Sequence, residues 1–181
     1  MDVLNHDIGH FESWCRAYVE RVPLSEARRV PYFEVAARAY SIWWSMSPAG
    51  LPCRQQLDPC RFGPALLPQL SLIELLEHGA DYYWRLCGEQ ATYVIGTRLA
   101  GKRLSTIEDE LNEAVYFRWA LDDVAEYAEP MFYVLRHRTV GGCPKRTYGV
   151  LLPLCDAQDV ARGGERPVRY ALGACDWVSD L

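Results

Sequence analysis

Residues 70–87, LSLIELLEHGADYYWRLC, form the centre of the predicted fold. This stretch contains two apolar and aromatic runs, Leu70–Leu76 and Asp81–Cys87, separated by four residues that include Gly79. Runs of this length on either side of a short glycine-containing connection predict two antiparallel strands joined as a β-hairpin. The elements on either side then decide which fold contains this hairpin.

Helices are predicted after the hairpin. Residues 90–95 have the pattern of a short helix, and Gly96 follows as its terminator. Ser105 and Glu108 have the spacing of a capping box, which predicts a longer helix over residues 105–127. Its buried stripe is expected to consist of Ile107, Leu111, Ala114, Phe117, Leu121 and Val124.

The last third of the chain is predicted to be three strands. Gly141 and Gly142 form a two-residue turn in this prediction, which pairs Arg138 with Lys145 across two antiparallel strands. Side chains alternate between faces, so one core face is predicted to hold Met131, Tyr133, Leu135, Tyr148, Val150 and Leu152. Residues 168–177 form the third strand and are expected to add Val168, Tyr170, Leu172 and Ala174 to that face.

Two amphipathic helices are predicted before the hairpin, over residues 11–22 and 31–47. The second face of the C-terminal strands is half apolar, so we expect the first helix to cover it, from the same chain or from a second copy. The expected dimer or partner surface consists of Phe11, Trp14, Tyr18, Val22, Phe132 and Trp177.

Composition excludes several classes of protein. Half of the 181 residues are apolar, which is typical of a folded domain. The formal net charge of -5 argues against a general nucleic-acid binder. The chain has no apolar run long enough to span a membrane and no secretory-signal pattern at its start, so a cytoplasmic location is predicted.

Cysteine and histidine spacing gives no metal or catalytic motif. The seven cysteines are scattered without a C-x-x-C pair, which favours reduced thiols over disulfides. The closest pair, Cys53 and Cys60, does not have a usual zinc spacing, and His6 and His10 lie in a terminal segment expected to be solvated. Nucleophile-elbow, phosphate-loop and H-E-x-x-H motifs are absent, so no enzyme is predicted.

Five predicted strands, with helices between the second and third, follow the order of a PAS sensory domain. Short motifs in the same order extend the resemblance: Trp43-Trp44, Gly50, Pro52, Arg54, Asp58-Pro59, Leu66-Leu67-Pro68, Tyr82 to Gly88, Gly96 to Gly101, Glu129-Pro130, and Leu151-Leu152-Pro153-Leu154 followed by Asp156. Over about residues 40–177, the chain resembles small bacterial stand-alone PAS proteins. The resemblance implies an α+β fold: a PAS-like five-stranded antiparallel sheet with flanking helices. We expect an N-terminal helical extension over residues 1–48 and a sensory domain over residues 49–178.

The resemblance implies a sensory or adaptor protein in bacterial signal transduction. No kinase, cyclase or DNA-binding segment follows Trp177, so output is expected through an unidentified partner protein or through a homodimer. A PAS sheet and its helices can enclose a ligand pocket. The candidate pocket residues are Trp84, Tyr93, Tyr133, His137, Tyr148 and Tyr170.

Other interpretations of these residues stay open. The inward aromatic side chains could form a filled core. No cofactor is predicted, although His137 could ligate haem and a flavin sensor is an alternative. A basic hairpin tip, which includes Arg136 and Lys145, could hold an anion. The rival class is a small α+β enzyme in which His137 and Glu89 act on a substrate.

Overall fold

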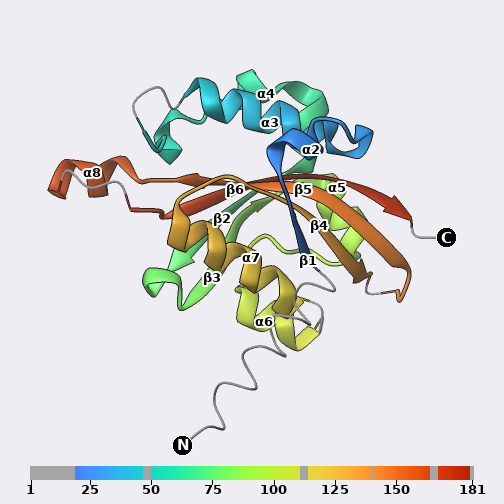
Figure 1. The fold of residues 1–181 in the computed structure, drawn as a ribbon. Coiled ribbons are helices and arrows are strands. Elements are labelled where there is room, and N and C mark those ends of the chain that lie inside the picture. Colours follow the sequence, from blue (N-terminus) through green and yellow to red (C-terminus); the bar gives the residue numbers. More distant parts are fainter. Residues whose placement is uncertain (1–18, 47–49, 111–113, 140, 164–166, 180–181) are drawn as a thin grey trace, which may run out of the picture.

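An antiparallel sheet forms the centre of the molecule (Figure 1). The computed structural model describes residues 19–46, 50–110, 114–139, 141–163 and 167–179. The strands of this part of the chain are β1 (Val19–Val22), β2 (Leu70–Leu76), β3 (Asp81–Cys87), β4 (Met131–Arg138), β5 (Pro144–Leu154) and β6 (Tyr170–Ser179). They lie in the order β1-β4-β5-β6-β2-β3, with every neighbouring pair antiparallel.

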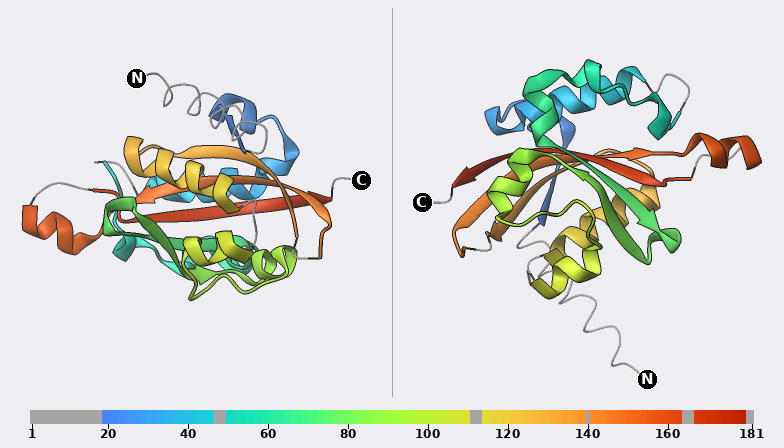
Figure 2. Two further views of the ribbon diagram at one scale, coloured as in Figure 1. Left: turned by 90° about the horizontal axis from the view of Figure 1, so that it is seen from below. Right: turned by 180° about the vertical axis from the view of Figure 1, so that it is seen from behind.

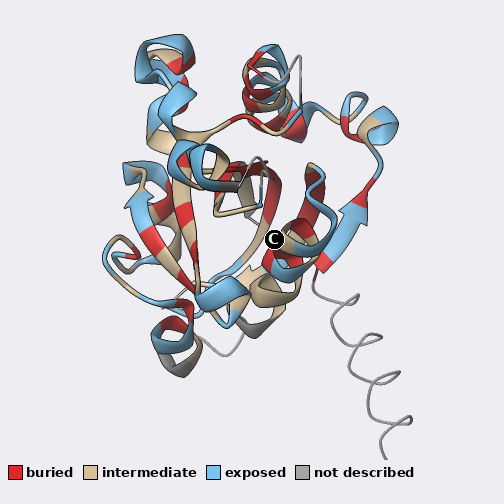
Figure 3. Ribbon diagram, turned by 90° about the vertical axis from the view of Figure 1, so that its left-hand side faces the viewer, coloured by how far each residue is buried: buried red, intermediate tan, exposed pale blue. Residues whose placement is uncertain are grey.

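Helices cover both faces of this sheet, which gives three layers (Figures 1 and 2). One layer contains α2 (Leu24–Ala27), α3 (Glu34–Ser45) and α4 (Pro59–Leu66), together with short 3-10 turns at Pro31–Phe33, Arg54–Gln56 and Leu67–Gln69. The other contains α5 (Glu89–Ile95), α6 (Leu104–Glu110) and α7 (Ala114–Tyr127). Helix α8 (Ala157–Gly163) lies in the connection from β5 to β6 and extends beyond one end of the sheet (Figure 1). Buried residues concentrate on the strands and on the inward sides of the helices (Figure 3).

The predicted α+β class and PAS-like strand order are confirmed. Strands β2 to β6 are the five expected strands, and α5 to α7 lie between the second and third of them. The central hairpin occupies Leu70–Leu76 and Asp81–Cys87, as predicted. Its connection has positive φ angles of 48° at Glu77, 60° at His78 and 95° at Gly79. A glycine at the third of these positions lowers the cost of the tight turn.

The sixth strand corrects the prediction of a helix over residues 11–22. Val19–Val22 form β1, an edge strand in which Val19 pairs with Leu135 and Val22 with Phe132. Both valines are buried whereas Glu20 and Arg21 are exposed, because the two valines pack into the cores on opposite faces of the sheet. Phe11, Trp14 and Tyr18 lie outside the described residues.

The predicted β4–β5 register is wrong by one residue. His137 pairs with Lys145 and Leu135 with Thr147, because the connection is longer than a two-residue turn and closes through a hydrogen bond from Thr139 N to Cys143 O (3.0 Å). A one-residue shift moves every side chain of a strand to the other face. Tyr148, Val150 and Leu152 therefore lie on the α3 side of the sheet, whereas Leu151 joins Met131 and Tyr133 on the other. Strand β6 follows the same correction, with Tyr170, Leu172 and Ala174 on the α3 side.

Helix α3 covers the half-apolar face that was expected to need a helix. Its Ala36, Ala39 and Trp43 side chains are buried in one cluster with residues of β4, β5 and β6. The Trp43 indole donates from Nε1 to the Pro153 carbonyl at 2.8 Å, which satisfies its polar group inside the core. The second of the two predicted N-terminal helices, from the same chain, thus covers the sheet.

The helix predicted over residues 105–127 is two helices, α6 and α7, which contact each other. The predicted capping box does not form, because Ser105 lies inside α6 and donates from Oγ to Asp81 Oδ2 at 2.8 Å. Glu108 instead pairs with Arg118 of α7 at 2.7 Å. Ser105 and Glu108 therefore contact residues of other elements instead of capping a helix together.

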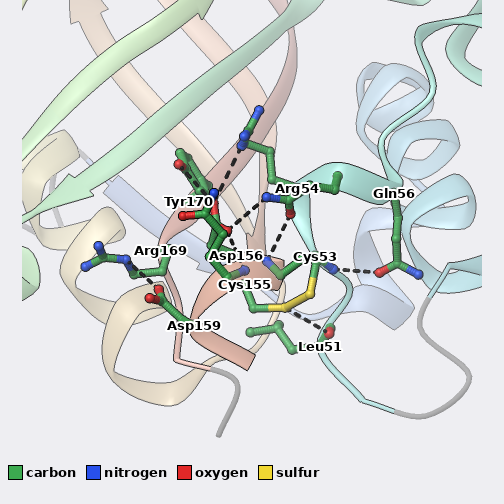
Figure 4. The surroundings of a disulfide bond; sticks show 12 residues. Leu51, Cys53, Arg54, Gln56, Cys155, Asp156, Asp159, Arg169 and Tyr170 are labelled. Carbon is green, nitrogen blue, oxygen red and sulfur yellow. Dashed lines mark hydrogen bonds and ion pairs between the residues drawn. A yellow bond between two sulfur atoms is a disulfide. The ribbon is translucent and has the colours of Figure 1, made fainter. Parts of the chain in front are cut away.

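A disulfide joins Cys53 to Cys155, so the prediction of reduced thiols is wrong for this pair (Figure 4). Their Cα atoms lie 4.3 Å apart although 102 positions separate them in the sequence. The segment before α4 runs beside the end of β5, with Arg54 N donating to Cys155 O at 2.8 Å and Cys155 N to Pro52 O at 3.0 Å. The pairing is created by this contact, so sequence spacing could not indicate it.

Candidate functional site

A cavity of about 110 Å³ lies between the sheet and the α5–α7 layer. Most of its wall is apolar and comes from all the surrounding elements: Ile73, Trp84, Ala91, Ile95, Leu99, Leu104, Ile107, Ala114, Phe117 and Leu135. Residues with polar atoms, and one glycine, complete the wall: Ser71, Tyr133, His137, Arg138, Thr147, Gly173, Cys175 and Trp177. Such a wall suits a mostly apolar molecule with few hydrogen-bonding groups.

Strand alternation places these side chains on the cavity wall. Tyr133, Leu135 and His137 are alternate residues of β4, and Gly173, Cys175 and Trp177 are alternate residues of β6. Between them, Thr147 of β5 pairs with both Leu135 and Trp177. Three strands therefore present neighbouring side chains to one cavity.

Gly149 makes room for the Tyr133 ring. It pairs with Tyr133 on one side and with Cys175 on the other, and a Cβ atom at this position would lie 2.5 Å from Tyr133 Cζ. The ring therefore lies across the β5 backbone, and the Tyr133 hydroxyl forms a hydrogen bond with the Cys175 thiol. Burial raises the pKa of both groups well above their ordinary values. Both groups are therefore protonated at neutral pH, which leaves this part of the wall uncharged and the thiol unreactive as a nucleophile.

A hydrogen-bonded pair lies at the hairpin end of the cavity. His137 Nε2 is 2.9 Å from Thr147 Oγ1, and which atom donates depends on the histidine tautomer. Thr147 is buried, with 4% of its surface exposed. The neighbouring Arg138 Nη1 donates to the Gly142 carbonyl at 3.1 Å, which stabilises the turn.

A polar network beside the cavity joins β3 to both helices of the covering layer. The Tyr82 hydroxyl donates to Asp122 of α7, and Arg118 of α7 forms ion pairs with Glu108 of α6 and, at 3.6 Å, with Asp81 of β3. Burial raises the pKa of Asp122, whereas at Asp81 the hydrogen bonds outweigh the effect of burial and lower the pKa. This network holds the α6–α7 layer over the cavity.

Three of the predicted pocket residues, Trp84, Tyr133 and His137, line the cavity. The other three do not. Tyr148 is on the opposite face, its ring centroid 5.3 Å from that of Phe33, and Tyr170 packs against the same α3-side cluster. Tyr93 has no place in the cavity wall because 82% of its surface is exposed on α5.

The predicted dimer or partner surface does not form from its described members. Phe132 is covered by α3 and 3% exposed, and Val22 is 7% exposed in the same cluster. Trp177 lies on the cavity side rather than beside Phe132, because the face expected for β6 was the wrong one.

The other cavity residues, among them Ser71, Phe117, Thr147 and Cys175, were not predicted from the sequence. Alternation is the signal that could have found the strand members. With the longer β4–β5 turn, the same rule places Thr147 beside His137. The helical stripe that contained Phe117 was predicted, but not which face of the sheet it covers.

No protein-family model and no curated protein sequence matches the chain. Among solved structures, it is similar to an RNA-binding light-oxygen-voltage (LOV) receptor, with 14% identity and a TM-score of 0.47 over 74% of this chain and 38% of that one. It is similar to a Rhodobacter sphaeroides LOV protein, with 15% identity and a TM-score of 0.42 over 78% of this chain and 67% of that one. A fungal LOV-domain photoreceptor gives 10% identity and a TM-score of 0.48 over 86% of this chain and all of that one. These TM-scores are below 0.5, so the fold class rests on the strand order of this chain.

Haem and flavin do not fit the cavity as the side chains lie. Pockets for drug-sized ligands and cofactors measure roughly 300–1,000 Å³, well above the 110 Å³ available here. The residue suggested as a haem ligand, His137, has its Nε2 atom within hydrogen-bonding distance of Thr147. Within the described ranges, no group of three or more His, Cys, Asp or Glu side chains could hold a metal ion. The same part of the chain has no helix long and apolar enough to cross a membrane.

Proposed function

We propose that this protein is a PAS-type sensory protein that binds a small, mostly apolar molecule in the cavity between the sheet and the α5–α7 layer. The observation that carries the proposal is a cavity wall that is largely apolar and includes the uncharged Tyr133, Thr147 and Cys175 side chains. A site of this kind orients an apolar ligand through one or two hydrogen bonds.

Cavity size bounds the ligand. An engineered apolar cavity of roughly 150 Å³ accommodates benzene, and the cavity here measures about 110 Å³. The ligand is therefore no larger than a single ring unless the helices move. Thr147 and Tyr133 supply hydroxyl groups at the wall, so a phenol-like molecule with one polar group matches it better than a pure hydrocarbon.

A route for the output follows from the packing of α7. This helix contributes Phe117 to the cavity and also contacts β1, where Arg21 pairs with Asp123 at 3.1 Å. Strand β1 continues into α2 and the N-terminal layer. A ligand that favours one position of α7 would thereby bias the arrangement of this layer. We propose residues 1–48 as the output extension and residues 49–178 as the sensory domain.

The positions of Glu89 and His137 do not favour the rival enzyme hypothesis. Glu89 begins α5 and does not line the cavity to which His137 contributes. The buried Cys175 thiol is protonated, so it does not supply a nucleophile in its place.

The test is a matched pair of glycine-to-valine variants. Gly173 lines the cavity, and a Cβ atom there would meet Leu151 and Ser71 at ordinary contact distances of 3.6 and 3.8 Å. Gly173→Val therefore fills part of the cavity, whereas Gly141→Val makes the same change in an exposed turn. Thermal unfolding is measured with benzene, phenol and flavin mononucleotide as probes.

We expect phenol to raise the Tm of the wild type and of Gly141→Val but not of Gly173→Val, and we expect flavin mononucleotide to have no effect. Equal shifts in Gly173→Val and in the wild type would refute the proposed site. So would the absence of any shift with either small probe. Visible absorbance of the purified protein provides an independent check, because a flavin or haem sensor would be coloured.

A further inference from the structure

A second concave region lies on the N-terminal layer. It is a surface groove of about 610 Å³ bordered by the end of α2, the Pro31–Phe33 turn and α3 from Glu34 to Ile42. Ala27 and Phe33 at its base are buried in the α3-side core, so they anchor α2 and the Pro31–Phe33 turn to the sheet. The chain changes direction between these two anchors, which leaves the groove open between α2 and α3.

The groove combines an apolar base with basic sides. Val30 and Ile42 are half-buried along it, and Arg28, Arg29 and Arg38 are exposed around it. A groove with this composition suits a segment that has apolar side chains on one face and charged side chains on the other.

The three arginines have no ion-pair partner among the residues that the structure describes. Elsewhere in the molecule, Arg118 and Arg169, for example, pair with carboxylates at 2.7 and 2.9 Å. Glu34 is the one acidic residue of the groove lining, so the groove carries a net positive charge on a chain whose formal charge is -5. Charge complementarity therefore points to an acidic partner.

We propose that this groove binds an acidic amphipathic helix of a partner protein. The apolar base takes the helix's apolar side chains, while Arg28, Arg29 and Arg38 pair with its carboxylates. Nucleic acid fits less well, because the base of the groove is apolar and the chain as a whole is acidic. This inference does not depend on a ligand in the cavity.

The experiment measures fluorescence anisotropy with a labelled peptide of about 18 residues, a length that gives roughly five helical turns. The peptide has leucine at helical spacing and glutamate elsewhere, and a second peptide has lysine in place of glutamate. The double variant Arg29→Gln/Arg38→Gln removes two groove charges. Its matched control, Arg98→Gln/Arg162→Gln, removes two exposed charges outside the groove.

We expect the acidic peptide to bind the wild type and the control equally, and to bind the groove variant about five- to tenfold more weakly. The lysine peptide should not bind, and added salt should weaken binding of the acidic one. Far-ultraviolet circular dichroism and the Tm confirm that each variant is folded. Retention of the phenol-induced Tm shift in the groove variant separates this test from that of the cavity.

Three results would overturn the proposal. The first is equal affinity of the acidic peptide for the groove variant and its control, or no binding to any of them. The second is groove-dependent binding of a labelled RNA oligonucleotide instead of the peptide, which would identify nucleic acid as the occupant. The third is a dimer, seen by light scattering, that Arg29→Gln/Arg38→Gln dissociates, because the occupant would then be a second copy of this chain.

Discussion

Loss of the Cys53–Cys155 disulfide is expected to lower the stability of the fold substantially. The bond closes a loop across a sequence separation of 102 residues. In the chain-entropy description, a cross-link over about 100 residues stabilises the folded state by about 4.7 kcal/mol at 25 °C, and measured values are often smaller. For a domain of this size, 1 kcal/mol corresponds to roughly 2–4 °C in Tm. Cys53→Ala should therefore lower the Tm by about 10–20 °C.

The matched control is Cys60→Ala, because Cys60 is an exposed free cysteine in the neighbouring α4. Urea unfolding followed by tryptophan fluorescence, with and without dithiothreitol, gives the free energy of unfolding of each variant. Reductant should destabilise the wild type and Cys60→Ala by similar amounts and leave Cys53→Ala nearly unchanged. The reasoning fails if Cys53→Ala is as stable as Cys60→Ala, or if Cys53 is fully alkylated in unfolded protein that was never reduced.

Two further predictions concern Gly149 and Asp156. Gly149→Ala would place its Cβ atom 2.5 Å from Tyr133 Cζ, so it should lower the free energy of unfolding, measured with urea, by about 1–3 kcal/mol. If Gly149→Ala lowers it no more than Gly141→Ala does in the exposed turn, the packing described is wrong. The pKa of Asp156 is lowered, first by the backbone hydrogen bond from Gln158. The ionised carboxylate therefore stabilises the folded state above the unfolded-state pKa near 3.8, and this stabilisation is lost as the pH falls through the folded-state pKa. The stability difference between the wild type and Asp156→Asn should therefore shrink between pH 7 and pH 3, and a difference that stays constant over this range would rule out this role.

Elements with strong local signals could be predicted from the sequence. The hairpin Leu70–Leu76 and Asp81–Cys87 follows from composition and a turn, and α5 ends at Gly96, which has a φ of 82°. Helix α3 begins after Pro31 and ends before Pro48, as its apolar spacing indicates. In each case the determining interactions lie within a few residues along the chain.

Three of the residues that line the cavity could also be predicted. Trp84, Tyr133 and His137 were identified from alternation along individual strands, which is a local property. Tyr148 was misplaced because its face depends on how β4 aligns with β5, and one additional turn residue reverses it. The position of Thr147 in the cavity depends on the same alignment.

The remaining features depend on contacts between residues far apart in the sequence. Val19–Val22 has the apolar spacing of a helix but forms a strand, because the edge of β4 supplies backbone hydrogen-bond partners and two cores that bury its valines. Ser105 bonds to Asp81 instead of capping its own helix, and Cys53 meets Cys155 across 102 residues. Local sequence patterns therefore indicate most of the elements and, through their order, the fold class. The tertiary structure decided the strand register, the disulfide and both proposed binding sites, because each of these requires the folded chain to bring distant residues together.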